Sequence, residues 1–265
     1  MSEIDESVVR ITRDGRFAAI TLCNPAKRNA LSLHVLEQLI TAFTQVGASD
    51  AEGIILNAEG PVFSAGHNFG EMKGAPESDA HHLFTVCSQL MQTVHRIPQP
   101  VVASVHALAT AAGCQLVATC DLAVAARSAS FALPGGKGGL FCHTPLVAVA
   151  RNLTQKRAME IALTGDPISA ETALEWGFIN DVVEDDQLHD ATVALLTRAT
   201  RGSVYSKALG KTTFYEQIEM TEDQAYKHAT DVMARAVVMP DAQEGIEAFL
   251  GKRHPNFTQR PNIEK

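Results

Sequence analysis

The chain has 265 residues, of which 46% are hydrophobic and 20% charged, as expected for a globular protein with one large domain or a core plus an appendage. Its formal net charge of -8 gives no electrostatic basis for binding nucleic acid. No segment approaches the roughly eighteen consecutive apolar residues of a membrane span. The N-terminal sequence MSEIDESVV lacks the basic and apolar regions of a targeting peptide. We therefore expect a cytoplasmic protein without nucleic-acid or membrane partners.

The five cysteines point to the same compartment. They are odd in number, show no metal-type spacing and lie among apolar residues. We expect free, buried thiols in a reducing environment and no metal site.

The first hundred residues alternate between short apolar runs and turn residues. Strands are predicted at residues 8–12, 17–22 and 53–57. Asp14-Gly15 is a hairpin signal between the first two strands, and Ser32 is placed to cap an amphipathic helix. Residues 70–80 lack periodicity and are expected to be mobile. A long amphipathic helix that ends before Pro98 follows them.

The central segment is residues 101–121, VVASVHALATAAGCQLVATCD. A β-branched run predicts a strand, residues 106–111 form a loop of small residues, and residues 112–120 are expected to be helical. The first-turn N–H groups of such a helix have no intrahelical acceptor, and small side chains let a ligand oxygen approach them. The segment is thus suited to hold a carbonyl oxygen that becomes negative during a reaction. The alternative is that the small residues serve close packing only.

The second half changes from strands to helices. Strands are predicted at residues 122–126, 130–133 and 178–183. Residues 135–139, GGKGG, are interpreted as a flexible loop, and a short helix is expected from His143. Residues placed to cap helices are Ser169, Gly165, Gly177, the pair Thr221 and Gln224, and the pair Asp241 and Glu244. We predict an α/β core at residues 1–200 and a helical C-terminal region at residues 201–265.

Five segments, in this order, carry a family resemblance that covers almost the whole chain. They are NPAKRNALS at 24–32, GPVFSAGHNFGEM at 60–72, ATAAGCQLVATCDLAVA at 109–125, LTGDPISAETALEWGFINDVV at 163–183 and EGIEAFLGKRHPNF at 244–257. The chain resembles the crotonase (enoyl-CoA hydratase/isomerase) superfamily. This resemblance implies an α/β fold of the ClpP/crotonase type, a spiral of ββα units with a helical C-terminal region that trimerises. It also implies a trimer, or a hexamer built as a dimer of trimers.

The resemblance also implies a ligand and the residues that bind it. The ligand is a coenzyme A thioester, as in fatty-acid or related acyl-CoA metabolism, and no cofactor is permanently bound. The oxyanion donors are the backbone N–H groups of His67 and Ala112, with Ala65 and Gly66 beside the thioester. Lys27, Arg28 and Ala30 lie along the adenosine and pantetheine, while Phe249 and Lys252 in the C-terminal helix cover the nucleotide of a neighbouring subunit. Ordinary solvated surface charge is the alternative for Lys27, Arg28 and Lys252.

Two positions depart from the pattern of hydratases, which hold and deprotonate water with two glutamates. Gln115 stands at one of these positions and Gly135 at the other. Losing one positioned acid–base group costs ~10²–10⁴ in rate, so little hydratase activity is expected. The titratable candidates that remain are His67, His143 and Glu71, and His143 either faces the acyl chain or merely starts a helix in solvent.

Two functional hypotheses follow. The first is a lyase or isomerase of CoA thioesters that stabilises a thioester oxyanion. The second is a non-catalytic acyl-CoA binding protein. They differ in whether a titratable group reaches the thioester α or β carbon.

Overall fold

A computed structural model describes residues 8–261, so the first seven residues of the N-terminal segment considered above lie outside it. Its main sheet has six strands in the order β1-β2-β3-β4-β6-β9. β1 (Val9–Asp14) and β2 (Phe17–Leu22) form the predicted hairpin, with Gly15 at φ +58° in the turn. The other strands run parallel to β2 and to one another: β3 (Ile54–Ala58), β4 (Val101–Val105), β6 (Leu122–Ala126) and β9 (Asp181–Val183).

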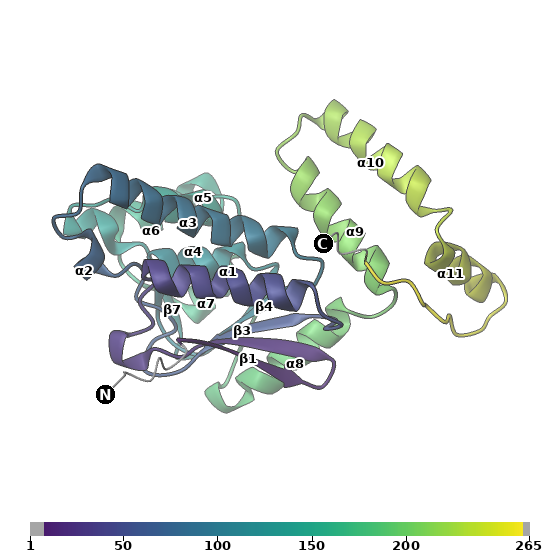
Figure 1. The fold of residues 1–265 in the computed structure, drawn as a ribbon, viewed down its shortest axis with the longest axis horizontal. Helices are drawn as coiled ribbons and strands as arrows, with labels where there is room; N and C mark the ends of the chain where they lie inside the picture. The colour runs from purple at the N-terminus through teal and green to yellow at the C-terminus, as the bar shows by residue number, and fades with distance from the viewer. Residues whose placement is uncertain (1–7, 262–265) are drawn as a thin grey trace.

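Helices cover both faces of this sheet, which explains why its inner strands β2, β3, β4 and β6 are mostly apolar. α1 (Leu33–Gly47) and α3 (Glu77–Arg96) lie on one face and α8 (Leu188–Ala199) on the other (Figure 1). Along β3, Ile54 and Leu56 pack into the larger core, whereas Ile55 packs into the smaller one beneath α8. The alternating side chains of each strand thus stabilise two separate apolar layers.

A second, smaller sheet supports the central helix. It contains β5 (Ala109–Thr110), β7 (Ser130–Ala132) and β8 (Ile168–Ser169). Directly after β5 begins α4 (Ala112–Thr119), one residue shorter than predicted, and every residue of this helix is buried. α5 (His143–Val149), α6 (Gln155–Thr164) and α7 (Ala170–Glu175) complete the core.

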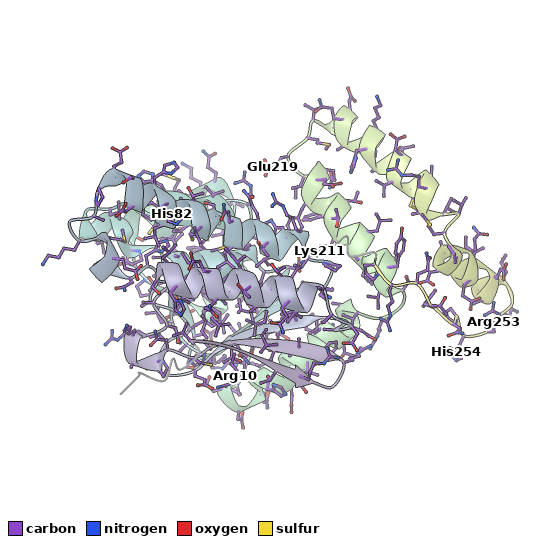
Figure 2. All side chains as sticks on the ribbon, viewed as in Figure 1. Arg10, His82, Lys211, Glu219, Arg253 and His254 are labelled. Atoms are coloured by element: carbon purple, nitrogen blue, oxygen red, sulfur yellow. The ribbon has the colours of Figure 1, made fainter. Side chains whose placement is uncertain are left out.

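The C-terminal helices extend away from that core. α9 (Val204–Gln217) lies against it, and α10 (Glu222–Ala236) and α11 (Pro240–Leu250) project beyond it (Figure 1). Lys211 of α9 points toward the core (Figure 2). Large apolar side chains on these helices remain exposed, among them Tyr226, Met233 and Phe249. The domain division at residue 200 stays a prediction.

Most predicted caps are confirmed. The Ser32 hydroxyl accepts the Val35 N–H, the Ser169 hydroxyl accepts the Thr172 N–H, and a capping box opens α10. Gly165 ends α6 at φ +61°.

The capping box predicted at Asp241 and Glu244 is wrong. Met239 is the N-cap, and Asp241 lies inside the first turn of α11. The Asp241 carboxylate instead accepts the Ser203 hydroxyl and the N–H groups of Thr258 and Gln259. Tertiary partners have replaced the local cap.

Three expectations about loops and strands also need correction. Residues 70–80 contain most of α2 (Phe69–Met72) and the start of α3. The Asn68 side chain caps α2 by accepting the Gly70 N–H. The GGKGG segment belongs to a 3-10 helix, Pro134–Gly138. The last core strand is shorter than predicted and begins at Asp181.

All five cysteines are free thiols, with Cys23 half-buried and the others buried. Among residues 8–261, no helix is both long and apolar enough to cross a membrane.

Candidate functional site

A cavity of about 450 Å³ lies where α2, α3, α4 and α5 meet, at the end of the molecule remote from α10 and α11 (Figure 1). Its wall contains five residues singled out from the sequence: Ala65, His67, Ala112, Gly135 and His143. The remaining wall is mainly apolar, with Phe69, Met72, Phe84, Leu140 and Phe141. The structure therefore brings two distant loops and the start of the central helix to one apolar space.

The loop that carries His67 and the loop that precedes α4 touch at Gly66. This residue has φ +82°, and a Cβ placed on it would lie 3.0 Å from the Thr110 carbonyl oxygen and 3.3 Å from the Ala112 nitrogen. The Thr110 N–H donates to the Ser64 carbonyl at 3.0 Å, which holds the loops in register. Only glycine combines this backbone conformation with so close an approach.

The two predicted oxyanion donors have no protein partner. Throughout the described residues, neither the His67 nor the Ala112 amide N–H donates a hydrogen bond to a protein acceptor. Ala112 is the first residue of α4, where an N–H has no intrahelical acceptor. Both donors thus remain available to a ligand oxygen.

Ala111, the residue before one donor, has a strained backbone. Its φ of 51° and ψ of -119° lie in a region that residues with a Cβ rarely adopt. Strain of this kind at a functional loop costs about 1–3 kcal/mol and persists where surrounding contacts impose it. Here the Ala111 N–H donates to the Ala132 carbonyl at 2.9 Å, which fixes the turn.

We expect Ala111→Gly to raise the free energy of unfolding by about 1 kcal/mol, because glycine adopts φ above zero without strain. Urea unfolding followed by circular dichroism measures the change. Ala109→Gly is the matched control, since Ala109 is buried two residues earlier and its φ is not positive. The control is expected to destabilise the protein, and a loss of stability in both variants would contradict the assignment of strain.

Asn29 is a positioning residue that sequence reasoning missed. Its side chain is fully buried, and its amide nitrogen donates to the carbonyls of Glu59 at 2.7 Å and Val62 at 3.0 Å. The Ser64 hydroxyl donates to the Asn29 carbonyl at 2.8 Å. Asn29 therefore ties the loop at residues 24–31 to the loop that carries His67. The available signal was an asparagine in a turn, since asparagine tolerates the positive φ of 49° found here.

Of the residues predicted to bind the coenzyme, Ala65 lines the cavity, whereas Lys27, Arg28 and Ala30 lie in the loop at residues 24–31, outside the cavity wall. Lys27 and Arg28 are exposed, and Ala30 is half-buried. The Arg28 carbonyl accepts the Ala65 N–H at 3.0 Å. Phe249 is 82% exposed at the end of α11. Lys252 lies beyond Leu250, where α11 ends, so its predicted placement within the helix is wrong.

The two positions that lack glutamates differ in their surroundings. Gln115 is 4% exposed and lies outside the cavity wall, where its Oε1 accepts the Cys87 thiol at 3.8 Å. Gly135 lines the cavity, but a Cβ there would lie 2.1 Å from the Leu140 carbonyl oxygen and 2.8 Å from the Cys142 Sγ. The backbone has closed over the space that a side chain at residue 135 would need.

The titratable groups of the wall are His67, Cys142 and His143. None of the wall residues, all within the described part of the chain, is Asp or Glu. His143 is exposed as the first residue of α5 and also borders the cavity, and its predicted position facing the acyl chain stays a prediction. Glu71 does not line the cavity, because its carboxylate accepts the Leu33 N–H at the start of α1.

Comparisons with known proteins show the family of this chain. The family model described as enoyl-CoA hydratase/isomerase matches residues 12–260. The chain belongs to the enoyl-CoA hydratase/isomerase family. A solved enoyl-CoA hydratase from Mycobacterium smegmatis is 41% identical with a TM-score of 0.92, and covers 95% of this chain and 99% of its own. Human enoyl Coenzyme A hydratase domain-containing protein 3 is also 41% identical, with a TM-score of 0.90 over 94% of this chain and all of its own.

A third relative of this family member corrects one expectation. The protein of Rattus norvegicus named "Enoyl-CoA hydratase domain-containing protein 3, mitochondrial" is 46% identical over 238 residues, which are 89% of this chain and 79% of that protein. Its name places it in mitochondria, so the expected cytoplasmic location is contradicted. The inference from acidic charge, free cysteines and the N-terminal residues failed because none of these features is specific to one reducing compartment. The crotonase fold, in contrast, is confirmed.

Proposed function

We propose that this enoyl-CoA hydratase/isomerase family member binds an acyl- or enoyl-CoA thioester with its acyl group in the cavity and its carbonyl oxygen between the N–H groups of His67 and Ala112. One observation carries the proposal: two unpaired amide donors, from separate loops, meet in the wall of a cavity that is otherwise mainly apolar. A thioester combines the two features that such a site recognises, an oxygen that accepts and an apolar chain. Ala65 and Gly66 would flank it, and Lys27, Arg28 and Ala30 would follow the coenzyme toward solvent.

The chemistry we propose is stabilisation of a thioester enolate. When the carbon beside the carbonyl loses a proton, negative charge develops on the carbonyl oxygen, where two fixed donors stabilise it. Such a donor typically contributes about 3–4 kcal/mol to the transition state. Hydration is not favoured, because no carboxylate of the wall can deprotonate a water.

A non-catalytic acyl-CoA binding protein is the second candidate. The observation that favours it is the absence of Asp and Glu from the described residues of the cavity wall. Both candidates require the thioester to occupy the donor pair, so the first experiment tests that occupancy alone.

The experiment compares Ala111→Gly with the double variant Ala111→Gly/Ala112→Pro. Proline is tolerated at the first position of a helix and removes only the N–H, and glycine before it avoids a steric conflict. Cinnamoyl-CoA, a conjugated thioester, is the probe, because donors on its carbonyl shift its absorbance to longer wavelength. We expect the shift in the wild type and in Ala111→Gly, and its loss in the double variant. Equal shifts in both variants would exclude Ala112 as a donor, and no shift with the wild type would overturn the proposal.

We also propose that the chain assembles as a trimer or a dimer of trimers through its C-terminal helices. An apolar groove of about 760 Å³ runs between α9 and α10, and Tyr226, Met233 and Phe249 are 68%, 69% and 82% exposed. Surfaces of this kind mark protein contacts. In such an assembly Phe249 and Lys252 would reach a neighbouring subunit's ligand, and light scattering of the purified protein measures the mass.

A further inference from the structure

Two residues that line the cavity each have a side-chain polar atom that is buried without a partner. Among the described residues, His67 Nε2 and Thr110 Oγ1 are buried and make no hydrogen bond, and both residues line the cavity. Buried polar atoms are almost always paired, so unpaired ones beside a cavity point to a group that the cavity receives. Neither atom is used by the backbone donor pair described above.

The hydrogen bonding of His67 defines its tautomer. Its Nδ1 lies 3.1 Å from the Leu31 carbonyl oxygen, which can only accept, so Nδ1 carries the proton and Nε2 carries a free lone pair. The ring also contacts Phe84 edge-on, with centroids 5.3 Å apart. The neutral imidazole therefore has a fixed orientation and a vacant acceptor.

The electrostatic surroundings favour this neutral form. Burial lowers the pKa of His67 from its ordinary 6.5, and this effect exceeds the opposing effects of the Leu31 carbonyl and of Glu71. Glu71 is the charged group of α2 that acts on the ring. Cys142, the N-cap of α5, and His143, the first residue of that helix, are the other titratable groups that line the same cavity. At neutral pH the ring is thus a base without a proton on Nε2.

We propose that the His67 side chain is the proton-transfer group of this cavity, acting on the α-carbon of a bound acyl-CoA. The Nε2 lone pair takes the α-proton, the C–H electron pair forms the enolate double bond, and the carbonyl π electrons move to the oxygen. That oxygen is held by the N–H groups of His67 and Ala112, and the reverse step returns a proton to carbon. The proposal rests on the proposed function, since it requires the thioester to sit at the donor pair.

One feature of the geometry favours His67 over His143 in this role. The same residue supplies a backbone donor to the carbonyl oxygen and a side-chain acceptor, so the ring is tied to the position of the carbon beside that carbonyl. His143 is exposed at the start of α5 and has no such tie. The catalytic atom is therefore assigned to His67 Nε2.

The test is exchange of the α-hydrogens of octanoyl-CoA for deuterium in D₂O, followed by mass spectrometry. The wild type is expected to catalyse the exchange, and His67→Gln, which keeps the backbone N–H, to slow it by about 10²-fold or more. His82→Gln is the matched control, because His82 is exposed on α3 (Figure 2), and it is expected to exchange at the wild-type rate. Exchange in the wild type should fall as the pH drops below the pKa of His67, which burial lowers from 6.5, because protonated Nε2 accepts no proton.

The outcomes distinguish proton transfer by His67 from the thioester binding on which it depends. A cinnamoyl-CoA shift retained in His67→Gln together with lost exchange supports the role of the side chain. A shift in the wild type without any exchange leaves the binding proposal standing and overturns this one. Undiminished exchange in His67→Gln, or loss of exchange in His143→Gln alone, would also overturn it. No shift with the wild type would reject the binding itself.

Discussion

Gly135→Glu is expected to lower the free energy of unfolding by about 3 kcal/mol and to leave the protein without hydratase activity. A glutamate at residue 135 would restore one of the two carboxylates expected of a hydratase. In the structure its Cβ would lie 2.1 Å from the Leu140 carbonyl oxygen, so the turn at residues 134–142 must move before any carboxylate can enter. Displacing backbone is costly, because no rotamer change relieves the overlap. The same result is expected when Gln115→Glu accompanies it.

Gly138→Glu is the matched control for this prediction. Gly138 belongs to the same turn and borders the same cavity, but a Cβ there meets nothing within 4 Å. Urea unfolding of the two variants, with Gly135→Ala to separate size from charge, measures the difference. Wild-type stability in Gly135→Glu, or hydration of enoyl-CoA by the Gln115→Glu/Gly135→Glu variant, would show that the turn accommodates a side chain and would contradict this account.

Lys211→Met is expected to cost about 3–5 kcal/mol, the cost of leaving one partner of a buried ion pair alone. Lys211 is buried on α9 where that helix meets the core (Figure 2). Its ammonium donates to Asp121 at 2.7 Å and to the carbonyls of Val94 and Gln99 at 2.8 and 2.9 Å. Removing it strands a carboxylate and two acceptors, and it releases the first of the C-terminal helices.

The surroundings of this ion pair explain why the loss cannot be made good locally. Asp121 also accepts the Tyr215 hydroxyl at 2.9 Å and the Val101 N–H at 2.7 Å. Burial lowers the pKa of Lys211 more than Asp121 raises it, and burial together with the charge of Asp121 raises the pKa of Tyr215. The ring of His95, on α3, stacks on the ring of Tyr215 with their centroids 3.7 Å apart. A dry environment of this kind makes an unpaired charge expensive.

Lys207→Met provides the control, since Lys207 is exposed on the same helix. It is expected to change stability by less than about 0.5 kcal/mol. Adding Asp121→Asn to Lys211→Met should recover part of the loss, because it removes the stranded charge. Equal stability of Lys211→Met and Lys207→Met in urea would show that the ion pair does not hold α9 to the core.

Local patterns in the sequence predicted much of the fold. The strand at residues 122–126 has the predicted bounds and the central helix differs by one residue, because apolar runs bounded by turn residues and a small-residue loop are local signals. The α2 helix was missed because a single turn has no periodicity. The predicted cap at Asp241 failed because residues distant in sequence compete for its carboxylate.

The sequence predicted some residues of the cavity wall, but it did not predict the space around them. Motif positions placed His67 and Ala112 in one cavity, and their roles stay predictions. The lack of space for a side chain at Gly135 depends on the path of the backbone to Leu140, and the amino-acid sequence does not reveal that path. Asn29 acts through carbonyls about thirty residues away, and Lys211 pairs with an aspartate ninety residues earlier. Interactions of that range depend on the folded arrangement, so a single sequence gives no sign of them.

The most direct test of the central claim is a crystal structure of the protein with octanoyl-CoA. We expect the thioester oxygen within about 3 Å of both the His67 and Ala112 amide nitrogens, with the acyl chain in the cavity between Phe84 and Phe141. An octanoyl chain bound elsewhere, such as the groove between α9 and α10, or a thioester oxygen that meets neither nitrogen, would contradict the assignment of this cavity as the acyl-thioester site.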